Sequence, residues 1–153
     1  MADAQAGALL DERAILLDAS AGGAEEAIRL AGQLLVDIDA VDPSYVDAML
    51  EREKSVSTVM SEGVAIPHGT SESRGSVRRD ALSFVRFPGG VDWNGEHVEI
   101  AIGIAAQPNS HVAILGKLAR VLVDADSAAQ LRSATEPQQV LDLLAPDEGD
   151  DDE

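Results

Sequence analysis

Residues 81–106 have the sequence ALSFVRFPGGVDWNGEHVEIAIGIAA, and this stretch decides the architecture of the chain. The apolar segment 81–87 predicts a strand, which Pro88-Gly89-Gly90 is expected to bend. Asn94-Gly95 is a strong signal for a tight hairpin turn. Beyond the turn, residues 98–106 are almost wholly apolar, which is typical of a central strand buried on both faces.

The segments before this hairpin predict a strand, two helices and a further short strand. Apolar residues recur at helical spacing in the first helix, and Asp18 and Ser20 are its candidate caps. Asp42-Pro43 predicts the start of the second helix. The four elements are expected at 14–17, about 22–39, about 43–53 and 64–66.

The second helix has two candidate faces. Tyr45 and Met49 share one face with Arg52, whereas Val46 and Leu50 lie on another. We expect Val46 and Leu50 to make the core contact. Tyr45 and Met49 would then lie beside Arg52 as an apolar docking surface for a partner protein.

Three helices are expected after the hairpin. Pro108-Asn109-Ser110 predicts a helix that starts near His111, and shorter helices are expected at 127–134 and 137–144. The polar stretch 69–79 lacks periodicity and predicts a loop. The order of strand, two helices, three strands and three helices predicts an α+β fold, with helices on both faces of a mixed sheet.

Length and composition exclude several classes of protein. The chain has 153 residues, 45% of them hydrophobic, which is enough for one domain with a sizeable core. It contains no cysteine, so disulfide frameworks, thiol catalysis and thiolate metal sites are excluded. No apolar run approaches the roughly 18–20 residues that cross a bilayer. The N-terminus has no basic region of the kind that begins a secretion signal. We therefore expect a cytoplasmic protein without membrane insertion.

The chain is strongly acidic, with a formal net charge of −17. Such a surface repels nucleic acid and anionic membranes. Residues 146–153 (PDEGDDDE) predict a disordered acidic tail, which leaves residues 1–145 as the folded domain and a charge of −11 on it. Acidic residues together with only two lysines favour a halophile, because high salt screens the repulsion. An arginine-favouring codon bias is the alternative.

His68 is the first candidate for chemistry. It follows Pro67, which holds Ile66 in an extended conformation, and precedes Gly69, which permits an abrupt turn. We expect an imidazole at the end of a strand, outside the core, with one face open between small neighbours. The alternative is an incidental loop histidine, held by a backbone contact.

His111 and Arg52 are the other candidates. His111 stands at a helix N-terminus, where N–H groups suit a phosphate, but it also begins an apolar stripe and would then be a partly buried helix residue. Arg52 can grip a phosphoryl group bidentately, or simply complement a helix C-terminus. His97, beside the hairpin turn, is expected on the surface.

Two histidines and an arginine fit covalent phosphoryl transfer better than the alternatives. A zinc site lacks a convincing third ligand, and no G-x-S-x-G sequence marks a serine hydrolase. A neutral imidazole is a competent nucleophile towards phosphorus, and a second histidine and an arginine can donate to the phosphoryl oxygens. No ATP-binding Gly-x4-Gly-Lys-Ser/Thr loop is present, so the donor would be another phosphoprotein.

Two blocks of sequence carry a family resemblance that spans about residues 10–145. The first contains Arg52-Glu53, Ser57-Thr58 and residues 63–69 (GVAIPHG). The second comprises residues 90–93 (GVDW), residues 102–106 (IGIAA), and Asn109-Ser110-His111 followed by Ile114-Leu115 and Leu118-Ala119. Together they resemble the mannitol/fructose-type enzyme IIA domains of the sugar phosphotransferase system.

The resemblance implies a three-layer α/β/α sandwich in which His68 is phosphorylated on Nε2. The phosphoryl group would come from the carrier protein HPr and pass to a cysteine of the IIB domain of a sugar permease. His111 and Arg52 match the other active-site residues of the family, and neither a cofactor nor a metal is implied. Ser110 departs from the acid that the family usually has there, which affects the orientation of His111. Because the chain lacks cysteine, we expect IIB on a separate polypeptide.

The resemblance leaves two functions open. One is a phosphotransferase component that feeds a fructose- or mannitol-type permease. The other is a regulatory relative of the nitrogen-linked type, which binds targets according to its phosphorylation state. The run 103–106 (GIAA) favours the sugar branch.

Overall fold

The hairpin expected from residues 81–106 forms the centre of the sheet. The computed structural model describes residues 10–55, 57–60, 63–107 and 110–144. The observed order confirms the prediction, with one 3-10 helix (η2) added. In chain order the elements are β1 (Leu10–Leu16), α2 (Ala24–Asp37), α3 (Ser44–Ser55), β2 (Val64–Ala65), η2 (Ser71–Ser76), β3 (Ala81–Trp93), β4 (Glu96–Ala105), α4 (His111–Leu122), α5 (Ala125–Arg132) and α6 (Pro137–Leu144).

The described strands form one mixed sheet in the order β1-β3-β4-β2. β3 and β4 are antiparallel, and Trp93 pairs with Glu96 across a two-residue turn. Asn94 and Gly95 both have positive φ, 57° and 98°, as the predicted turn requires. The pairing shifts between Arg86 and Val91, where Pro88-Gly89-Gly90 interrupts the ladder. β1 and β2 join the hairpin in parallel on its two sides.

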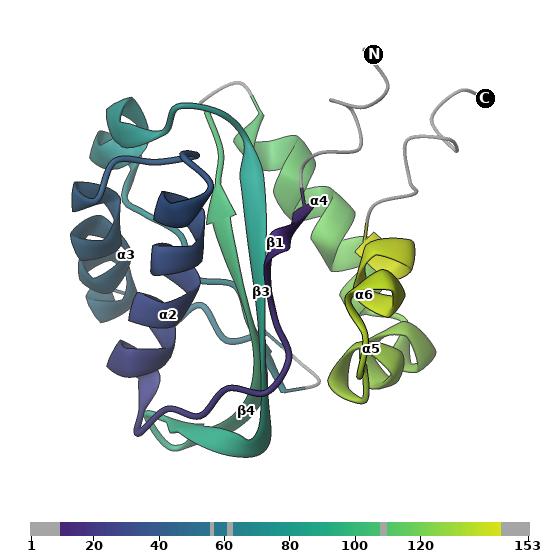
Figure 1. Cartoon of the computed structure of the whole chain (residues 1–153). Coiled ribbons are helices and arrows are strands. Elements are labelled where there is room, and N and C mark those ends of the chain that lie inside the picture. The colour runs from purple at the N-terminus through teal and green to yellow at the C-terminus, as the bar shows by residue number, and fades with distance from the viewer. Residues whose placement is uncertain (1–9, 56, 61–62, 108–109, 145–153) are drawn as a thin grey trace.

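Helices cover both faces of the sheet. α2 and α3 lie on one face, whereas α4, α5 and α6 lie on the other (Figure 1). The predicted three-layer arrangement is therefore confirmed. The expected helices near 111, at 127–134 and at 137–144 are confirmed too, with a shift of two residues for α5.

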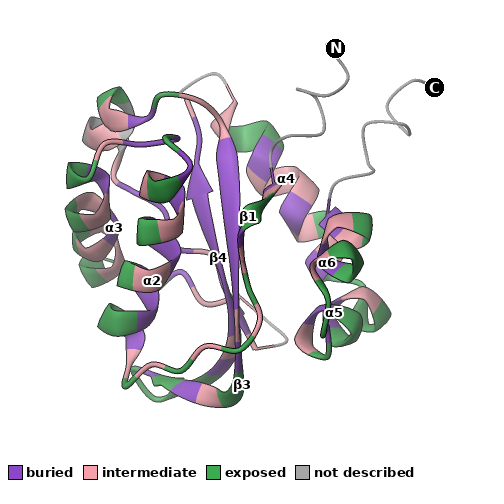
Figure 2. Cartoon of the chain, viewed as in Figure 1, coloured by how far each residue is buried: buried purple, intermediate pink, exposed green. Residues whose placement is uncertain are grey.

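The central strands contribute to two separate cores, because successive side chains point to opposite faces. On β4, Ala101 and Ala105 belong to the core beneath α2 and α3. Ile100, Ile102 and Ile104 belong to the core beneath α4, α5 and α6. All five are fully buried, in accord with the sequence prediction for this strand (Figure 2).

Small residues let α2 approach the sheet closely. A Cβ on Gly103 would lie 2.4 Å from Ser83 Oγ and 3.2 Å from Ala31 Cβ. The buried Ser83 hydroxyl donates a 2.8 Å hydrogen bond to the Ala31 carbonyl of α2. The Gly103 position therefore has no room for a side chain.

The prediction for the faces of α3 is wrong. Tyr45 and Met49 are the buried residues of this helix, at 3% and 0% exposure, and Val46 and Leu50 are only partly buried. Gly32 of α2 lets α3 approach closely, since Val46 Cγ2 and Met49 Sδ lie within about 3 Å of where a Cβ would stand. The Tyr45 hydroxyl donates a buried hydrogen bond to the Ile104 carbonyl of β4, which turns the face with Tyr45 and Met49 towards the sheet. Tyr45 and Met49 therefore do not form a docking surface.

Three local predictions need smaller corrections. β1 begins at Leu10, four residues earlier than expected, and Leu16 near its end is 37% exposed. The N-cap of α2 is Gly23 rather than Asp18 or Ser20, and the Glu26 side chain accepts a hydrogen bond from Gly22 N–H. The loop expected at 69–79 contains η2.

Other predictions fall outside the described residues or concern membranes. The expected acidic tail, 146–153, and the expected capping residues Pro108 and Asn109 lie outside the described residues. Within the part of the chain that the structure describes, every helix is too short or too polar to cross a bilayer.

Candidate active site

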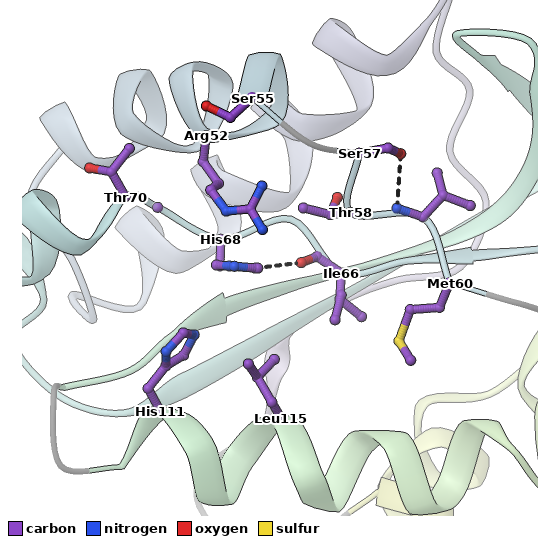
Figure 3. Close-up of a pocket in the computed structure, with 12 residues that line it drawn as sticks. Arg52, Ser55, Ser57, Thr58, Met60, Ile66, His68, Thr70, His111 and Leu115 are labelled. Carbon is purple, nitrogen blue, oxygen red and sulfur yellow. Dashed lines mark hydrogen bonds between the residues drawn. The ribbon is translucent and has the colours of Figure 1, made fainter.

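The three candidate residues line one pocket of about 620 Å³ (Figure 3). Arg52 comes from the last turn of α3, His68 follows β2, and His111 begins α4. The side chains of Ser57, Thr58 and Leu115 line the same pocket. Segments far apart in the sequence thus bring together the residues that the sequence singled out.

His68 is more buried than the sequence predicts. Only 9% of the residue is exposed, although we expected it outside the core. The reason is its neighbours: Pro67 O accepts a 3.0 Å hydrogen bond from Ile104 N–H, and His68 forms an isolated parallel bridge with Ile104. The residues after β2 therefore continue along β4 at the edge of the sheet.

A backbone carbonyl selects the tautomer of the His68 ring. Nδ1 lies 2.8 Å from the carbonyl oxygen of Ile66. Because a carbonyl oxygen only accepts, Nδ1 must be the protonated nitrogen, and in the neutral ring Nε2 then carries the lone pair. This geometry suits Nε2 as a nucleophile, which is the atom that the family resemblance implies.

His111 is the first residue of α4, as the sequence predicts, and it is partly buried. Its ring centroid lies 5.4 Å from that of His68, with 57° between the ring planes. Ser110 occupies the N-cap without a side-chain capping bond. The first N–H groups of a helix carry partial positive charge, so this end of α4 favours an anion in the pocket.

Arg52 extends from α3 with its guanidinium directed towards the His68 ring (Figure 3). It is partly buried. A guanidinium offers donors in a planar fork that matches two oxygens of a phosphoryl group. Arg52, His111 and the α4 terminus together surround the pocket beside His68 with positive or donating groups.

Glu53 fixes the wall of the pocket opposite α4, a role that the sequence did not reveal. Its Oε1 accepts the Thr58 hydroxyl at 2.6 Å, and its Oε2 accepts Thr58 N–H and Trp93 Nε1–H, each at 3.0 Å. These three bonds tie the end of α3 to segment 57–60 and to β3. Glu53 and Thr58 are five positions apart, and both belong to the first block of the family resemblance. Trp93 is 40 positions from Glu53, so no local pattern indicates that contact.

The pocket is suited to a nucleophilic histidine that receives an anionic group. Among the described residues, no group of three or more His, Cys, Asp or Glu side chains is arranged to hold a metal ion. His97, the third histidine, lies away from this pocket on β4, where its Nε2 is 3.0 Å from Glu99 Oε2 and its side chain is 67% exposed. This agrees with the surface position predicted for His97.

The family model described as "Phosphoenolpyruvate-dependent sugar phosphotransferase system, EIIA 2" matches residues 8–146. The chain belongs to this family. The mannitol-specific phosphotransferase enzyme IIA component of Staphylococcus aureus is 40% identical over 131 residues, which cover 84% of this chain and 91% of that protein. The mannitol-specific EIICBA component of Pasteurella multocida is 39% identical over 140 residues, or 89% of this chain, but the match covers only 22% of that longer protein.

Solved structures of EIIA 2 relatives have the same fold. The chain matches enzyme IIA mannitol of Escherichia coli, in its complex with phosphorylated enzyme IIB mannitol, with a TM-score of 0.81 and 38% identity, covering 90% of this chain and 99% of that one. The nitrogen regulatory protein IIA-Ntr of Neisseria meningitidis gives a TM-score of 0.79 at 26% identity, covering 90% and 97% of the two chains. The fold is thus shared by the sugar-specific and the regulatory branches.

Proposed function

We propose that the chain is the enzyme IIA component of a mannitol- or fructose-class sugar phosphotransferase system. His68 accepts a phosphoryl group from phospho-HPr and passes it to the cysteine of a IIB domain. The observation that carries the proposal is the His68 ring, held through Nδ1 by Ile66 O in a pocket that also contains Arg52 and His111.

Each transfer is balanced without a cofactor. The lone pair of His68 Nε2 forms a bond to phosphorus while the phosphorus–nitrogen bond of the carrier histidine breaks, and that electron pair returns to the carrier ring. In the second transfer, the IIB thiolate attacks phosphorus and the pair returns to Nε2. The proton stays on Nδ1 throughout, where it donates to Ile66 O, and this hydrogen bond stabilises the ring in both states.

Arg52 and His111 assist by binding the phosphoryl oxygens in the transition state. Negative charge is spread over three oxygens there, and fixed donors stabilise it without reorganising. The N-terminal amides of α4 act in the same direction. These roles agree with the direction of Arg52 towards His68 and with the 5.4 Å separation of the two rings.

The mannitol-specific relatives favour a role in sugar uptake over a purely regulatory one, because they are 39–40% identical, against 26% for the nitrogen regulatory protein. We place this activity in the cytoplasm, where HPr and IIB domains would meet it. The sugar is recognised by the permease, since a IIA domain contacts only proteins and the phosphoryl group.

A reconstituted relay tests the proposal. Purified chain is incubated with phosphoenolpyruvate, enzyme I, HPr and a mannitol IIB domain, and labelled phosphate is followed from protein to protein. We expect phosphate to pass through this chain to the IIB cysteine. A chain that accepts phosphate but transfers none to mannitol or fructose IIB domains would favour the regulatory alternative, and a chain that accepts none would contradict both.

A further inference from the structure

Tyr45 lies directly behind the turn that carries His68. It is the only tyrosine of the sequence, and 3% of it is exposed. It belongs to α3, as Arg52 does, but its ring belongs to the core between that helix and the sheet. Its hydroxyl group reaches the backbone of the active-site segment.

The hydroxyl of Tyr45 connects two backbone groups that are far apart in the sequence. It donates a hydrogen bond of 2.8 Å to the carbonyl oxygen of Ile104, 59 residues away. It also accepts a hydrogen bond of 2.9 Å from Gly69 N–H, 24 residues away. Both bonds are buried. Removal of the hydroxyl would therefore leave the Gly69 N–H and the Ile104 carbonyl without this partner.

The result is that both sides of His68 are tied to Ile104. On the N-terminal side, Pro67 O accepts from Ile104 N–H directly, at 3.0 Å. On the C-terminal side, Gly69 N–H reaches Ile104 O through the Tyr45 hydroxyl. Ile104 lies on the central strand β4, which is paired with β3 on one side and with β2 on the other.

The Tyr45 ring also presses against the turn itself. A Cβ added to Gly69 would lie 2.5 Å from Tyr45 Cε1 and 2.4 Å from Ser73 Oγ. Glycine therefore permits a contact between ring and backbone that no other residue would allow. Packing and hydrogen bonding thus act on the same residue, directly after His68.

We propose that Tyr45 is a positioning residue for phosphoryl transfer, because its hydroxyl fixes the backbone on the C-terminal side of His68; this inference rests on the proposed function. Transfer in line requires Nε2, phosphorus and the departing atom to be aligned, and a displacement of about 1 Å can slow an enzyme roughly a hundredfold. The Ile66 carbonyl fixes the side-chain torsion of the His68 ring through Nδ1. Tyr45 fixes the backbone position from which that ring extends, through Gly69 N–H.

Tyr45→Phe tests the inference, because it keeps the ring and removes only the hydroxyl. We expect phosphorylation by phospho-HPr to slow on the order of tenfold in kcat, with KM for phospho-HPr unchanged, because the hydroxyl is buried and does not touch the carrier. We also expect the Gly69 amide proton to exchange with solvent at least about tenfold faster.

Ile28→Val is the matched control. Ile28 lies in the same core cluster, at 1% exposure, and is not among the described residues that line the active-site pocket. This variant loses stability through a missing methyl group but should keep the transfer rate of the wild type. Transfer by Tyr45→Phe at the wild-type rate, or slowing of both variants alike, would overturn the inference. A wild-type chain that phospho-HPr does not phosphorylate would overturn the proposed function and this inference together.

The single tyrosine provides a second measurement that does not depend on the folding of Tyr45→Phe. Growth on 3-fluorotyrosine labels position 45 alone. We expect its 19F resonance to shift when His68 is phosphorylated, and to stay fixed in a His68→Ala chain mixed with the same reagents. A resonance that does not respond to phosphorylation would contradict a coupling between the two residues.

Discussion

The rings of His68 and His111 lie 5.4 Å apart, centroid to centroid, and are tilted by 57°. They come from different elements, one after β2 and the other at the start of α4. A phosphoryl group on Nε2 of His68 would therefore lie near the His111 ring and near the N-terminus of α4, which carries partial positive charge.

We expect His111→Ala to slow transfer by about 10²–10³, the typical effect of removing one fixed donor from a charge-stabilising site. His111→Gln should keep part of the rate, because its amide still donates. Rapid-quench measurements of transfer to IIB, beside urea melts, separate catalysis from stability. A loss of stability with an intact rate would mean that His111 is only a packing residue of α4.

Arg52→Lys should slow transfer by a similar factor of about 10²–10³, although the charge is retained. Lysine cannot supply two parallel N–H bonds to the phosphoryl oxygens. If Arg52 only complements the dipole of α3, the variant would transfer normally. Truncation at Arg52 would then cost no more than about 0.3–1 kcal/mol of stability. The same quench and melt experiments decide between these outcomes.

Glu53→Gln should destabilise the chain by about 1–3 kcal/mol, because the carboxylate accepts three hydrogen bonds and an amide presents N–H groups to the same donors. The Trp93 indole reports on the change by fluorescence, and it is the only tryptophan. Glu51→Gln is the control, since Glu51 is exposed on the same helix and its change should stay within about 0.5 kcal/mol. Equal melts for the two variants would contradict a structural role for the Glu53 contacts.

Stability should rise with salt. Residues 1–145, which we expect to form the folded domain, carry a formal charge of −11, and the Debye length is only ~3 Å at 1 M salt. We expect the thermal midpoint to increase steadily between low salt and about 2 M KCl. A midpoint that does not change over this range would argue against adaptation to a salty cell and in favour of a codon bias.

Much of the fold follows from local pattern. The Asn94-Gly95 turn, the continuous apolar run of β4 and the helical stripe after His111 are all signals within a dozen residues, and the structure has each of them. The pocket residues could also be identified from the sequence. Pro67 and Gly69 single out His68, and the predicted helix ends single out Arg52 and His111.

The remaining features depend on contacts that no local pattern contains. The buried face of α3 depends on such contacts. Met49 packs against Gly32 of α2, and the Tyr45 hydroxyl donates to the Ile104 carbonyl. The burial of His68 likewise follows from its pairing with Ile104, 36 positions along the chain. Hydrogen bonds across such separations are set by the tertiary fold, and the residue types alone do not specify them.

The central claim is that His68 receives the phosphoryl group on Nε2, and mapping the phosphate tests it most directly. The chain is phosphorylated with phospho-HPr, and the phosphate is located by fragmentation of the intact peptide and by NMR of the imidazole nitrogens. We predict one acid-labile phosphate, on Nε2 of His68, and none on a folded His68→Ala chain. Stoichiometric phosphate on His68→Ala, or phosphate mapped to His111 or to Nδ1, would contradict the account.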